Sequence, residues 1–254
     1  MLMINILLSG CNGKMGQVIT RLAAEREDLK IVAGYDQNTS IQNTYPVFSD
    51  LSKCDVNVDV IIDFSHPAAL ESLMQYAVSK KIPAVIATTG LFSAQVQMLK
   101  DASKVIPVFF SANMSLGVNL LIDLVKKAAR VLAKDFDIEI VEKHHNQKID
   151  APSGTALAIA DAINSCLEQQ QEYIYDRHSR RKKRSKNEIG IHAVRGGTIV
   201  GEHSVIFAGN DEIIEINHIA TSKEIFGVGA LNAAVFLHKK GSGMYNMDDL
   251  IGSK

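Results

Sequence analysis

A short run near the middle of the chain brings together side chains that exchange protons. His144 and His145 are adjacent, and Lys148 follows shortly after them. Histidine gives or takes a proton near neutral pH, and lysine supplies a cation or a second acid. In an extended segment the two histidines point to opposite sides, so one can face a ligand while the other packs or orients it. A purely structural pair is the alternative, but the nearby lysine and glycine turn favour a site of proton transfer.

A Pro-Ser-Gly-Thr run opens the helix-like segment that follows. Ser153 is suited to cap this helix, and Gly154 and Thr155 would then present backbone N–H groups that have no partner inside the helix. Such a helix start suits a carboxylate or a phosphate, with simple capping as the alternative. With His145 and Lys148 close in the sequence, it predicts a small dianionic substrate.

The first strand-like segment leads into a glycine-rich turn. Gly10, Gly13 and Gly16 follow the spacing GxxGxxG, and Asp36 ends the next strand-like segment. Glycines permit a tight turn, the following helix start attracts a pyrophosphate, and an acid at this distance binds ribose hydroxyls. An ordinary turn with a surface aspartate is the alternative. The combination predicts dinucleotide binding.

The residues near the acid bear on the choice of cofactor. Gln37 follows Asp36, and no arginine stands there to hold a 2′-phosphate, so NADH should be accepted. Lys14 could still attract a phosphate, which leaves NADPH open. Small polar residues at 87–90 and 111–114 end two later strands, where an open α/β sheet binds its ligands. These segments are candidates for the nicotinamide ribose pocket, although each taken alone fits an ordinary loop better.

Strand-like and helix-like segments alternate through the first part of the chain. The expected strands span residues 4–8, 31–35, 58–64, 83–89 and 106–111, and the expected helices span residues 15–23, 68–80 and 93–103. This alternation predicts right-handed crossovers and a parallel, doubly wound sheet.

The pattern changes after this region. Helical periodicity at residues 116–132 and 155–167 flanks a strand at residues 136–141 that leads into the histidines. Residues 189–194, 198–208 and 212–219 are expected to form antiparallel strands, joined by Gly196-Gly197 and by Gly209-Asn210-Asp211. A last helix, at residues 223–238, is expected to pack back on the first domain.

The composition excludes several classes of protein. The chain has 254 residues, 46% of them hydrophobic, and it balances 27 basic against 28 acidic residues, which argues against a nucleic-acid or membrane partner. Its three cysteines lie far apart, so neither a disulfide framework nor a cysteine-rich zinc site is expected. Adjacent histidines seldom chelate one ion, so we expect no metal site. The apolar run at residues 4–8 is too short for a signal sequence or a membrane span, and we expect a cytoplasmic protein.

Read together, several motifs resemble one family. GCNGKMG, Asp36, ATTG, FSANMSLGVN, EKHHNQKIDAPSGTA and VRGGTIVGEHSVIF closely resemble the 4-hydroxy-tetrahydrodipicolinate reductase family, historically dihydrodipicolinate reductase. The resemblance runs from Ile4 to the C-terminal GMYNMDDLI, and the HHxxKxDAPSGTA stretch is its most specific part.

The resemblance implies an enzyme of the diaminopimelate route to lysine, which uses NADH or NADPH to reduce a cyclic dicarboxylate to tetrahydrodipicolinate with loss of water. It implies an α/β chain: a doubly wound Rossmann-type nucleotide domain at residues 1–114 and 224–254, and an α+β domain at residues 115–223 with a mixed, largely antiparallel sheet. The second domain would bind substrate and form a homotetramer.

The resemblance also assigns roles to individual residues. His144 would be the proton donor and acceptor, and Lys148 would be a second proton donor and a carboxylate partner. Substrate binding falls to His145, Lys148, Gly154 and Thr155. The implied cofactor-binding residues are Gly10, Cys11, Asn12, Gly13, Lys14, Met15, Asp36, Ala87, Thr88, Thr89, Ser111, Ala112, Asn113 and Met114.

The chain departs from the family pattern in places, and two other functions compete. Ala87 stands where the family commonly has glycine, and Gln37 replaces a basic residue, which weakens the case for NADPH preference. The basic run at residues 177–186 is expected to be a solvated, mobile loop, with steering of an anionic substrate as the alternative. The competing functions are an oxidoreductase acting on another small carboxylate and a non-enzymatic NAD-binding redox sensor.

Overall fold

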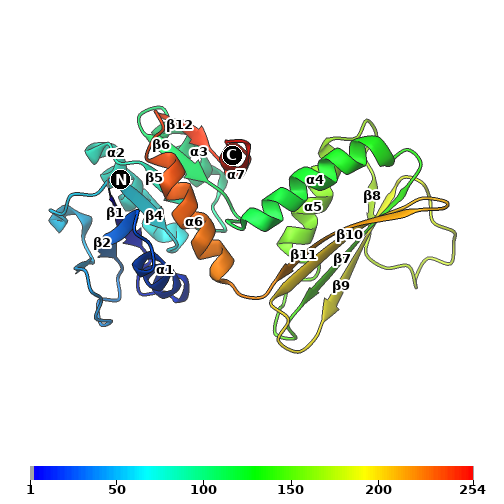
Figure 1. Ribbon diagram of the computed structural model, residues 1–254, viewed down its shortest axis with the longest axis horizontal. Helices are drawn as coiled ribbons and strands as arrows, with labels where there is room; N and C mark the ends of the chain where they lie inside the picture. The colour runs from blue at the N-terminus through cyan, green and yellow to red at the C-terminus, as the bar shows by residue number, and fades with distance from the viewer. Residues whose placement is uncertain (1–2, 254) are drawn as a thin grey trace. The chain divides into compact units, whose positions relative to one another are not determined.

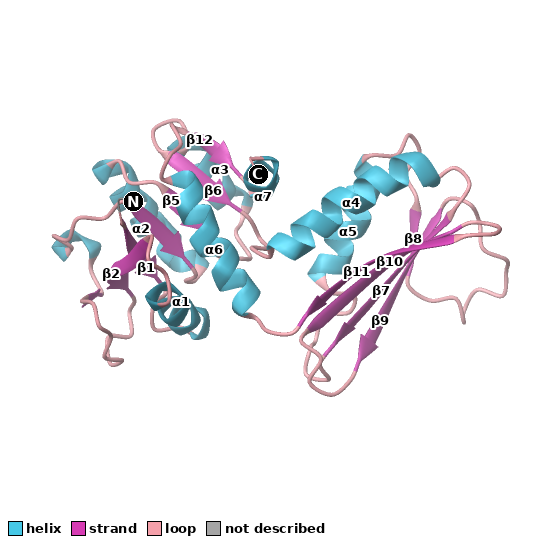
Figure 2. Ribbon diagram, in the orientation of Figure 1, coloured by secondary structure: helices cyan, strands magenta, loops and turns pink. Residues whose placement is uncertain are grey.

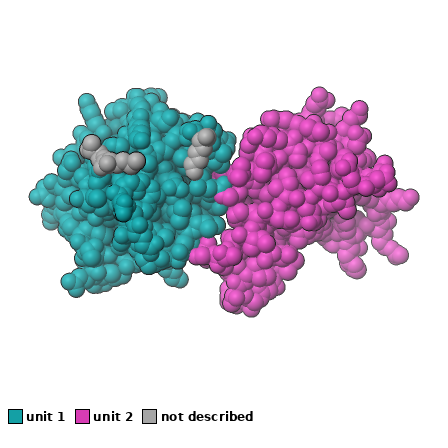
Figure 3. Space-filling view, in the orientation of Figure 1, with its two compact units in different colours: residues 1–116, 224–254 teal, residues 117–223 magenta. Residues whose placement is uncertain are grey.

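The computed structural model describes residues 3–253 and divides the chain into two compact units (Figure 3). The first unit comprises residues 1–116 and 224–254, and the second comprises Gly117–Lys223. The sequence predicts that the first segment of this unit ends at residue 114, two residues before its end in the structure, and that the second segment begins at residue 224, as it does in the structure. Each unit contains its own β-sheet.

The first unit is built on a seven-stranded sheet in the order β12-β6-β5-β4-β1-β2-β3, and all its strand pairs are parallel. The strands are β1 (Ile4–Ser9), β2 (Leu29–Tyr35), β3 (Val47–Phe48), β4 (Val60–Asp63), β5 (Ala84–Ile86), β6 (Pro107–Phe110) and β12 (Gly243–Tyr245). The chain runs outward from β1 in both directions, so the crevice beyond the carboxyl ends of β1 and β4 is where such a sheet binds ligands. The predicted Rossmann-type α/β domain is confirmed.

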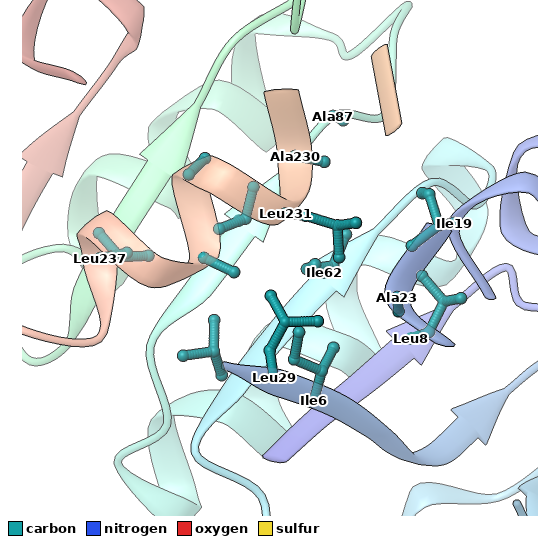
Figure 4. Close-up of a cluster of buried hydrophobic side chains, with 14 of the residues drawn as sticks. Ile6, Leu8, Ile19, Ala23, Leu29, Ile62, Ala87, Ala230, Leu231 and Leu237 are labelled. Atoms are coloured by element: carbon teal, nitrogen blue, oxygen red, sulfur yellow. The ribbon is translucent and has the colours of Figure 1, made fainter. Parts of the chain in front are cut away.

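Helices cover both faces of this sheet (Figure 1). Ile6 and Leu8 of β1 face one side with α1 and α6, whereas Leu7 faces the other side with α2 and α3. Figure 4 shows the first of these cores, where side chains of the two helices meet those of β1, β2 and β4. The helices are α1 (Lys14–Ala24), α2 (Leu70–Lys80), α3 (Ser93–Ala102), α6 (Glu224–Leu237), α7 (Met247–Gly252) and the 3₁₀ turns η1 (Leu51–Lys53) and η2 (Pro67–Ala69). Burial on both faces explains why the strands read as continuous apolar runs.

The second unit packs two helices on one face of a five-stranded sheet, as Figure 2 shows. The helices are α4 (Leu116–Leu132) and α5 (Gly154–Ser165), and the sheet order is β11-β10-β7-β9-β8. The strands are β7 (Asp137–His144), β8 (Glu172–Ile174), β9 (Glu188–Arg195), β10 (Gly201–Ala208) and β11 (Ile213–Ala220). Apolar side chains from α4, α5, β7, β9 and β10 form its core.

Strand β7 connects this core to the segment that contains the two histidines. Alternate residues of β7 are buried, so Ile138 and Ile140 enter the core. Because the strand period is two, Glu142 and His144 continue on the same buried face at the carboxyl end of the strand. The helix-covered face therefore ends in two ionisable side chains.

The second sheet is mixed, as predicted, but one predicted hairpin is wrong. Strand β9 pairs parallel with β7, and β10 lies on the other side of β7, so Gly196 and Gly197 do not join neighbouring strands. Their backbone groups instead form hydrogen bonds with the chain at the end of β7. Gly196 N–H donates to the His144 carbonyl (2.9 Å), and the Gly197 carbonyl accepts from Asn146 N–H (3.2 Å). The turn after β10 does close a hairpin with β11, as predicted.

The parallel part of the second sheet is larger than expected. Its antiparallel pairs are β10 with β11 and β10 with β7, whereas β7 with β9 and β8 with β9 are parallel. The sequence analysis also missed β3, β8, β12 and α7, which are short elements with too few residues to show a period. Among the residues that the structure describes, no helix combines the length and apolar character needed to cross a membrane.

The basic loop at residues 177–186 is largely exposed, as expected, but two of its arginines are anchored on carboxylates. Arg177 donates to Glu139 (2.7 Å) and Glu188 (2.9 Å). Arg184, whose side chain is 17% exposed, bonds Glu139 (2.9 Å) and Asp137 (3.0 Å). Charge-assisted hydrogen bonds to strands β7 and β9 thus hold the loop against the sheet face opposite the helices.

Replacing Arg184 with alanine should therefore loosen this loop. Removing hydrogen bonds between charged groups costs roughly 1.5 kcal/mol or more, which corresponds to about tenfold more local opening. We expect trypsin to cut residues 175–187 about tenfold faster in Arg184→Ala than in Lys183→Ala. Lys183 is a matched control because it is exposed, removes one trypsin site and forms no ion pair among residues 3–253. Equal cleavage rates in both variants would show that the arginine does not anchor the loop.

Candidate active site

The glycine turn after β1 brings two stretches of backbone into close contact. Gly10 has a left-handed backbone (φ +76°), and its N–H donates to the Tyr35 carbonyl at the end of β2 (2.8 Å). Helix α1 begins at Lys14, directly after Gly13, which has no side chain with which to cap it. A Cβ at Gly16 would lie 2.2 Å from the Gly10 carbonyl oxygen, so only glycine fits there. The turn therefore presents the uncapped start of α1 to the crevice.

Asp36 connects this turn to the end of β2. Its Oδ2 accepts from Asn12 N–H (2.9 Å), and its Oδ1 accepts from Asn38 N–H (2.9 Å). Each carboxylate oxygen has a further lone pair, so the group can hold the turn and still accept from a ligand hydroxyl. The structure thus gives Asp36 a role within the protein that sequence reasoning did not predict.

A pocket of about 390 Å³ opens beside the turn. Eight of the predicted cofactor-binding residues line it: Gly13, Lys14, Met15, Ala87, Thr88, Thr89, Ala112 and Met114. The other six are not among its lining residues: Gly10, Cys11, Asn12, Asp36, Ser111 and Asn113. Sequence reasoning missed Phe64, Ser65 and Phe226. Phe64 and Ser65 follow β4 and could have been found by the strand-end rule, whereas only the fold brings Phe226 from α6.

A buried carboxyl group supports the floor of this pocket. Asp63, at the end of β4, accepts from the hydroxyls of Ser65 and Thr88, both at 2.6 Å. Burial raises the pKa of Asp63, while these hydrogen bonds act in the opposite direction. Burial, aided by the nearby Asp36 carboxylate, raises the pKa of the Cys11 thiol to about 12, so this thiol stays protonated at neutral pH.

The histidine segment forms a second site, in the second unit. His144 is the last residue of β7, its side chain is 11% exposed, and its Nδ1 lies 2.6 Å from Glu142 Oε2. His145 is only partly buried and lies just beyond the strand. The adjacent histidines thus have different surroundings, and His144 is the one joined to the buried carboxylate.

Glu142 is fully buried and receives hydrogen bonds from several elements. Its Oε2 contacts His144 Nδ1 (2.6 Å) and accepts from Arg195 Nη1 (2.7 Å). Its Oε1 accepts from Arg195 Nη2 (2.7 Å) and from Ser153 N–H (2.9 Å). Burial alone would raise the pKa of Glu142, but the bonds from Arg195, His144 and Ser153 outweigh it and leave the pKa lowered. The group is therefore a carboxylate at neutral pH.

A third histidine lies beside His144. The ring centroids of His144 and His203 are 5.3 Å apart in an edge-to-face arrangement, and His203 Nε2 lies 3.1 Å from Ser153 Oγ. Burial, together with nearby His144, lowers the pKa of His203 to about 4, so His203 is neutral at neutral pH. Sequence reasoning did not predict His203 or Arg195, because they come from β10 and β9, far along the chain.

The predicted anion-binding groups lie at the start of α5. Ser153 caps this helix, and its Oγ accepts from Ala156 N–H (3.2 Å). Lys148 Nζ is 2.7 Å from Asp150 Oδ1, and bonds from Lys148 and from the Gly154 N–H lower the pKa of Asp150. One protein carboxylate thus contacts both the predicted ammonium group and the helix N-terminus. A ligand carboxylate that binds these two groups must share or displace Asp150.

Two family models together match nearly the whole chain. The model described as "Dihydrodipicolinate reductase, N-terminus" matches residues 4–114, and "Dihydrodipicolinate reductase, C-terminus" matches residues 117–251. The first match covers the glycine turn and the pocket beside it, and the second covers the histidine segment.

Proteins of similar sequence share this name. The 4-hydroxy-tetrahydrodipicolinate reductase of Caldanaerobacter subterraneus subsp. tengcongensis is 56% identical over 250 residues, which are 98% of this chain and 99% of the relative. That of Clostridium tetani is 52% identical over 252 residues, which are 99% of this chain and 98% of the relative.

A solved structure has the same fold. Dipicolinate-bound dihydrodipicolinate reductase from Paenisporosarcina sp. TG-14 aligns with a TM-score of 0.82 at 24% identity, covering 96% of this chain and 98% of that one. The diaminopimelate dehydrogenase of C. glutamicum aligns less well, with a TM-score of 0.59 at 17% identity, over 98% of each chain.

The close approach in the glycine turn predicts the effect of one added methyl group. Gly16→Ala would force the Gly10 carbonyl away from α1, which we expect to cost about 1–3 kcal/mol in stability and to weaken dinucleotide binding about tenfold or more. Calorimetric titration with NADH and thermal unfolding would measure both effects. Gly241→Ala is the control, because a Cβ there meets no atom within 4 Å. Unchanged nucleotide affinity in Gly16→Ala would show that the turn does not contact the nucleotide.

The neutral state of His203 predicts a loss of stability in acid. Its pKa is about 4 in the folded chain and 6.5 ordinarily, so between these values only the unfolded chain takes up the proton. Stability is then fully present above the ordinary value and falls as the pH drops, in total by about 3 kcal/mol. We expect His203→Gln to lose less stability than the unmutated chain between about pH 7 and about pH 4.5 in urea unfolding. His178 is exposed, so His178→Gln should keep the dependence of the unfolding free energy on pH that the unmutated chain shows. The same dependence in His203→Gln would contradict the neutral state assigned to His203.

Proposed function

The chain belongs to the dihydrodipicolinate reductase family, and we propose that each of its two units binds one of the two reactants of the family's reaction. The chain is an NAD(P)H-dependent oxidoreductase, a 4-hydroxy-tetrahydrodipicolinate reductase of lysine biosynthesis. The first unit binds NADH or NADPH, and the second binds the dicarboxylate substrate. The observation that carries this division is the buried Glu142–His144 pair beside Lys148 and the start of α5, in a different unit from the glycine turn.

The turn and pocket of the first unit fit a dinucleotide. The uncapped start of α1 and Lys14 would hold the pyrophosphate, and Asp36 would bind the adenosine ribose. Main-chain and side-chain groups at Ala87–Thr89 and Ser111–Met114 would surround the nicotinamide ribose. When bound, the reduced nicotinamide supplies a hydride. The remaining proposed cofactor contacts are Gly10, Cys11, Asn12, Gly13 and Met15.

The histidine site provides the proton that must accompany the hydride. Loss of the hydroxyl as water leaves a conjugated imine in the substrate ring, and reduction of this system by two electrons places negative charge on nitrogen or on an enamine carbon. His144 gives a proton to that position, and Lys148 is the second acid. The balance is one hydride and one proton added and one water lost. Positioned acids and helix N–H groups stabilise the charge as it develops.

Two carboxylates of the substrate need cationic or N–H partners. We assign Lys148 and the N–H groups of Gly154 and Thr155 to one carboxylate, because they converge at the start of α5. His145 supplies a further contact from just beyond β7. Binding exchanges the internal Asp150 carboxylate for that of the substrate, so the site is already shaped for such a group.

The helix-free face of the second sheet supports the proposed homotetramer. Val194, Ile213 and Ile219 lie on the side opposite α4 and α5 and are 44%, 67% and 64% exposed. Apolar side chains in such numbers on a sheet face favour burial against another copy of the chain. We propose that this cytoplasmic enzyme assembles through that face.

The function is tested by following absorbance of the reduced nicotinamide while the preceding synthase makes the substrate from pyruvate and aspartate semialdehyde. Synthase-dependent oxidation of NADH or NADPH is the expected result. His144→Gln should lower kcat about 10²–10⁴-fold, with nucleotide affinity unchanged because the nucleotide pocket is in the other unit. Exposed His178→Gln is the matched control.

Two outcomes would overturn these proposals. Nucleotide binding without oxidation of either cofactor would favour a redox sensor or an enzyme for another carboxylate. Full turnover in His144→Gln, with activity established for the unmutated chain, would remove His144 from the mechanism and leave the family reaction standing.

A further inference from the structure

We propose that Glu142 is a positioning residue that holds His144 with its ring proton on Nδ1, so that Nε2 is the atom that exchanges a proton with the substrate. This inference rests on the proposed function of His144 and deepens it. It assigns a role to Glu142, and with it to Arg195 and the N–H of Ser153, in the chemistry of a neighbouring side chain.

Hydrogen-bond donors surround the Glu142 side chain. Arg195 approaches with two N–H groups, one to each oxygen, at 2.7 Å, and Ser153 N–H donates to Oε1 at 2.9 Å. All three are donors that cannot accept. Both oxygens of Glu142 must therefore act as acceptors, which a carboxylate does and a protonated carboxyl group cannot do fully.

The Glu142 carboxylate determines which nitrogen of the His144 ring carries a hydrogen. Since Oε2 is an acceptor, the His144 Nδ1 that lies 2.6 Å away must carry a hydrogen. In the neutral ring Nε2 then has the free lone pair, and in the protonated ring Nε2 carries the second proton. Glu142 thus selects the tautomer, in the way that a carboxylate orients the histidine of a proton-transfer pair.

The other ring nitrogen, Nε2, faces a glycine of the neighbouring strand β10. A Cβ at Gly201 would lie 3.1 Å from Nε2, which is tighter than most real contacts, so a side chain at this position would crowd Nε2. Nδ1 points into the protein, toward a side chain with no exposed area. One side of the ring is thus fixed and the other is left for the reaction.

The charged and titratable groups near the ring agree with this assignment. Glu142 comes from β7, Arg195 from β9, His203 from β10, and Lys148 from the loop before α5, while His218 on β11 is the strand partner of His203. Of these, the Glu142 carboxylate is the group that contacts Nδ1 directly. His203 remains neutral beside it, because burial lowers its pKa to about 4.

Glutamine at position 142 would break the arrangement while nearly keeping its shape. Its NH₂ group must face either the Arg195 and Ser153 donors, which is repulsive, or Nδ1 and one Arg195 N–H. Facing Nδ1, the NH₂ group donates, so the ring proton moves to Nε2. We expect Glu142→Gln to lower kcat by about 10²-fold or more, with KM values for substrate and cofactor close to those of the unmutated chain.

The direct test is nitrogen NMR of the full chain labelled with ¹⁵N-histidine, because the two ring nitrogens have distinct shifts in each tautomer. The His144 signals are assigned by their loss in His144→Gln. We expect the neutral ring to be the Nδ1–H tautomer in the unmutated chain and the Nε2–H tautomer in Glu142→Gln. An Nε2–H tautomer in the unmutated chain would overturn the inference without any need for a folded variant.

Kinetics give a second readout that mere stability would not move. A general loss of structure would change kcat and KM together, whereas loss of the tautomer should lower kcat alone in Glu142→Gln. Glu202→Gln is the matched control, because Glu202 pairs with Lys143 (2.9 Å) on the opposite face of the sheet. The control should keep kcat, KM and the tautomer; an unchanged kcat in Glu142→Gln would contradict the proposal.

Two further variants keep the result interpretable. If Glu142→Gln does not fold, Arg195→Lys removes the two-pronged contact and keeps the charge, and it should shift the tautomer balance in the same direction but less. Gly201→Ala should lower turnover by crowding Nε2 while leaving the tautomer unchanged. An unchanged tautomer in Arg195→Lys together with a changed one in Gly201→Ala would overturn the assignment. Turnover by the unmutated chain in the same assay separates failure of this inference from failure of the proposed function.

Discussion

The candidate active site depends on one buried carboxylate. Glu142 lies at the end of the central strand β7, and its oxygens are bonded by the side chain of β9 residue Arg195, by the backbone at the start of α5 and by His144. A charge without exposed area is costly unless every lone pair has a donor, so these partners must keep their places together. The same bonds that make the burial tolerable also fix the His144 ring, which we propose exchanges the proton.

A different constraint governs the first unit, where backbone atoms rather than charges set the geometry. Gly16 of α1 approaches the Gly10 carbonyl so closely that any side chain would collide. This contact holds the start of the helix over the end of β1, and Asp63 ties Ser65 to Thr88 below the adjoining pocket. Helix start, turn and strand ends therefore form one preorganised surface for an anionic ligand.

The two faces of the second sheet serve different purposes. One face is covered by α4 and α5, and its apolar core ends in Glu142, His144 and His203. The opposite face carries exposed isoleucines and the carboxylates that hold Arg177 and Arg184. Alternation along β7 sends successive residues to opposite sides, so Glu142 and His144 lie on the helix-covered face, whereas Asp137 and Glu139 lie on the other face and hold the arginines.

Local sequence determined the elements and the residue types of the site. The strand and helix periods, the glycine turn with Asp36, and the HHxxKxDAPSGTA motif all depend on neighbours within a few turns of chain, and the Rossmann-type domain and the family followed from them. Only the tertiary structure decided the partners. Strand pairing placed β7 between β9 and β10, which overturned the predicted hairpin and brought Arg195 to Glu142 and His203 to His144. Such contacts join residues about fifty positions apart. The spacing of apolar residues within one segment cannot predict them, because backbone hydrogen bonding and burial of the whole sheet select the strand order.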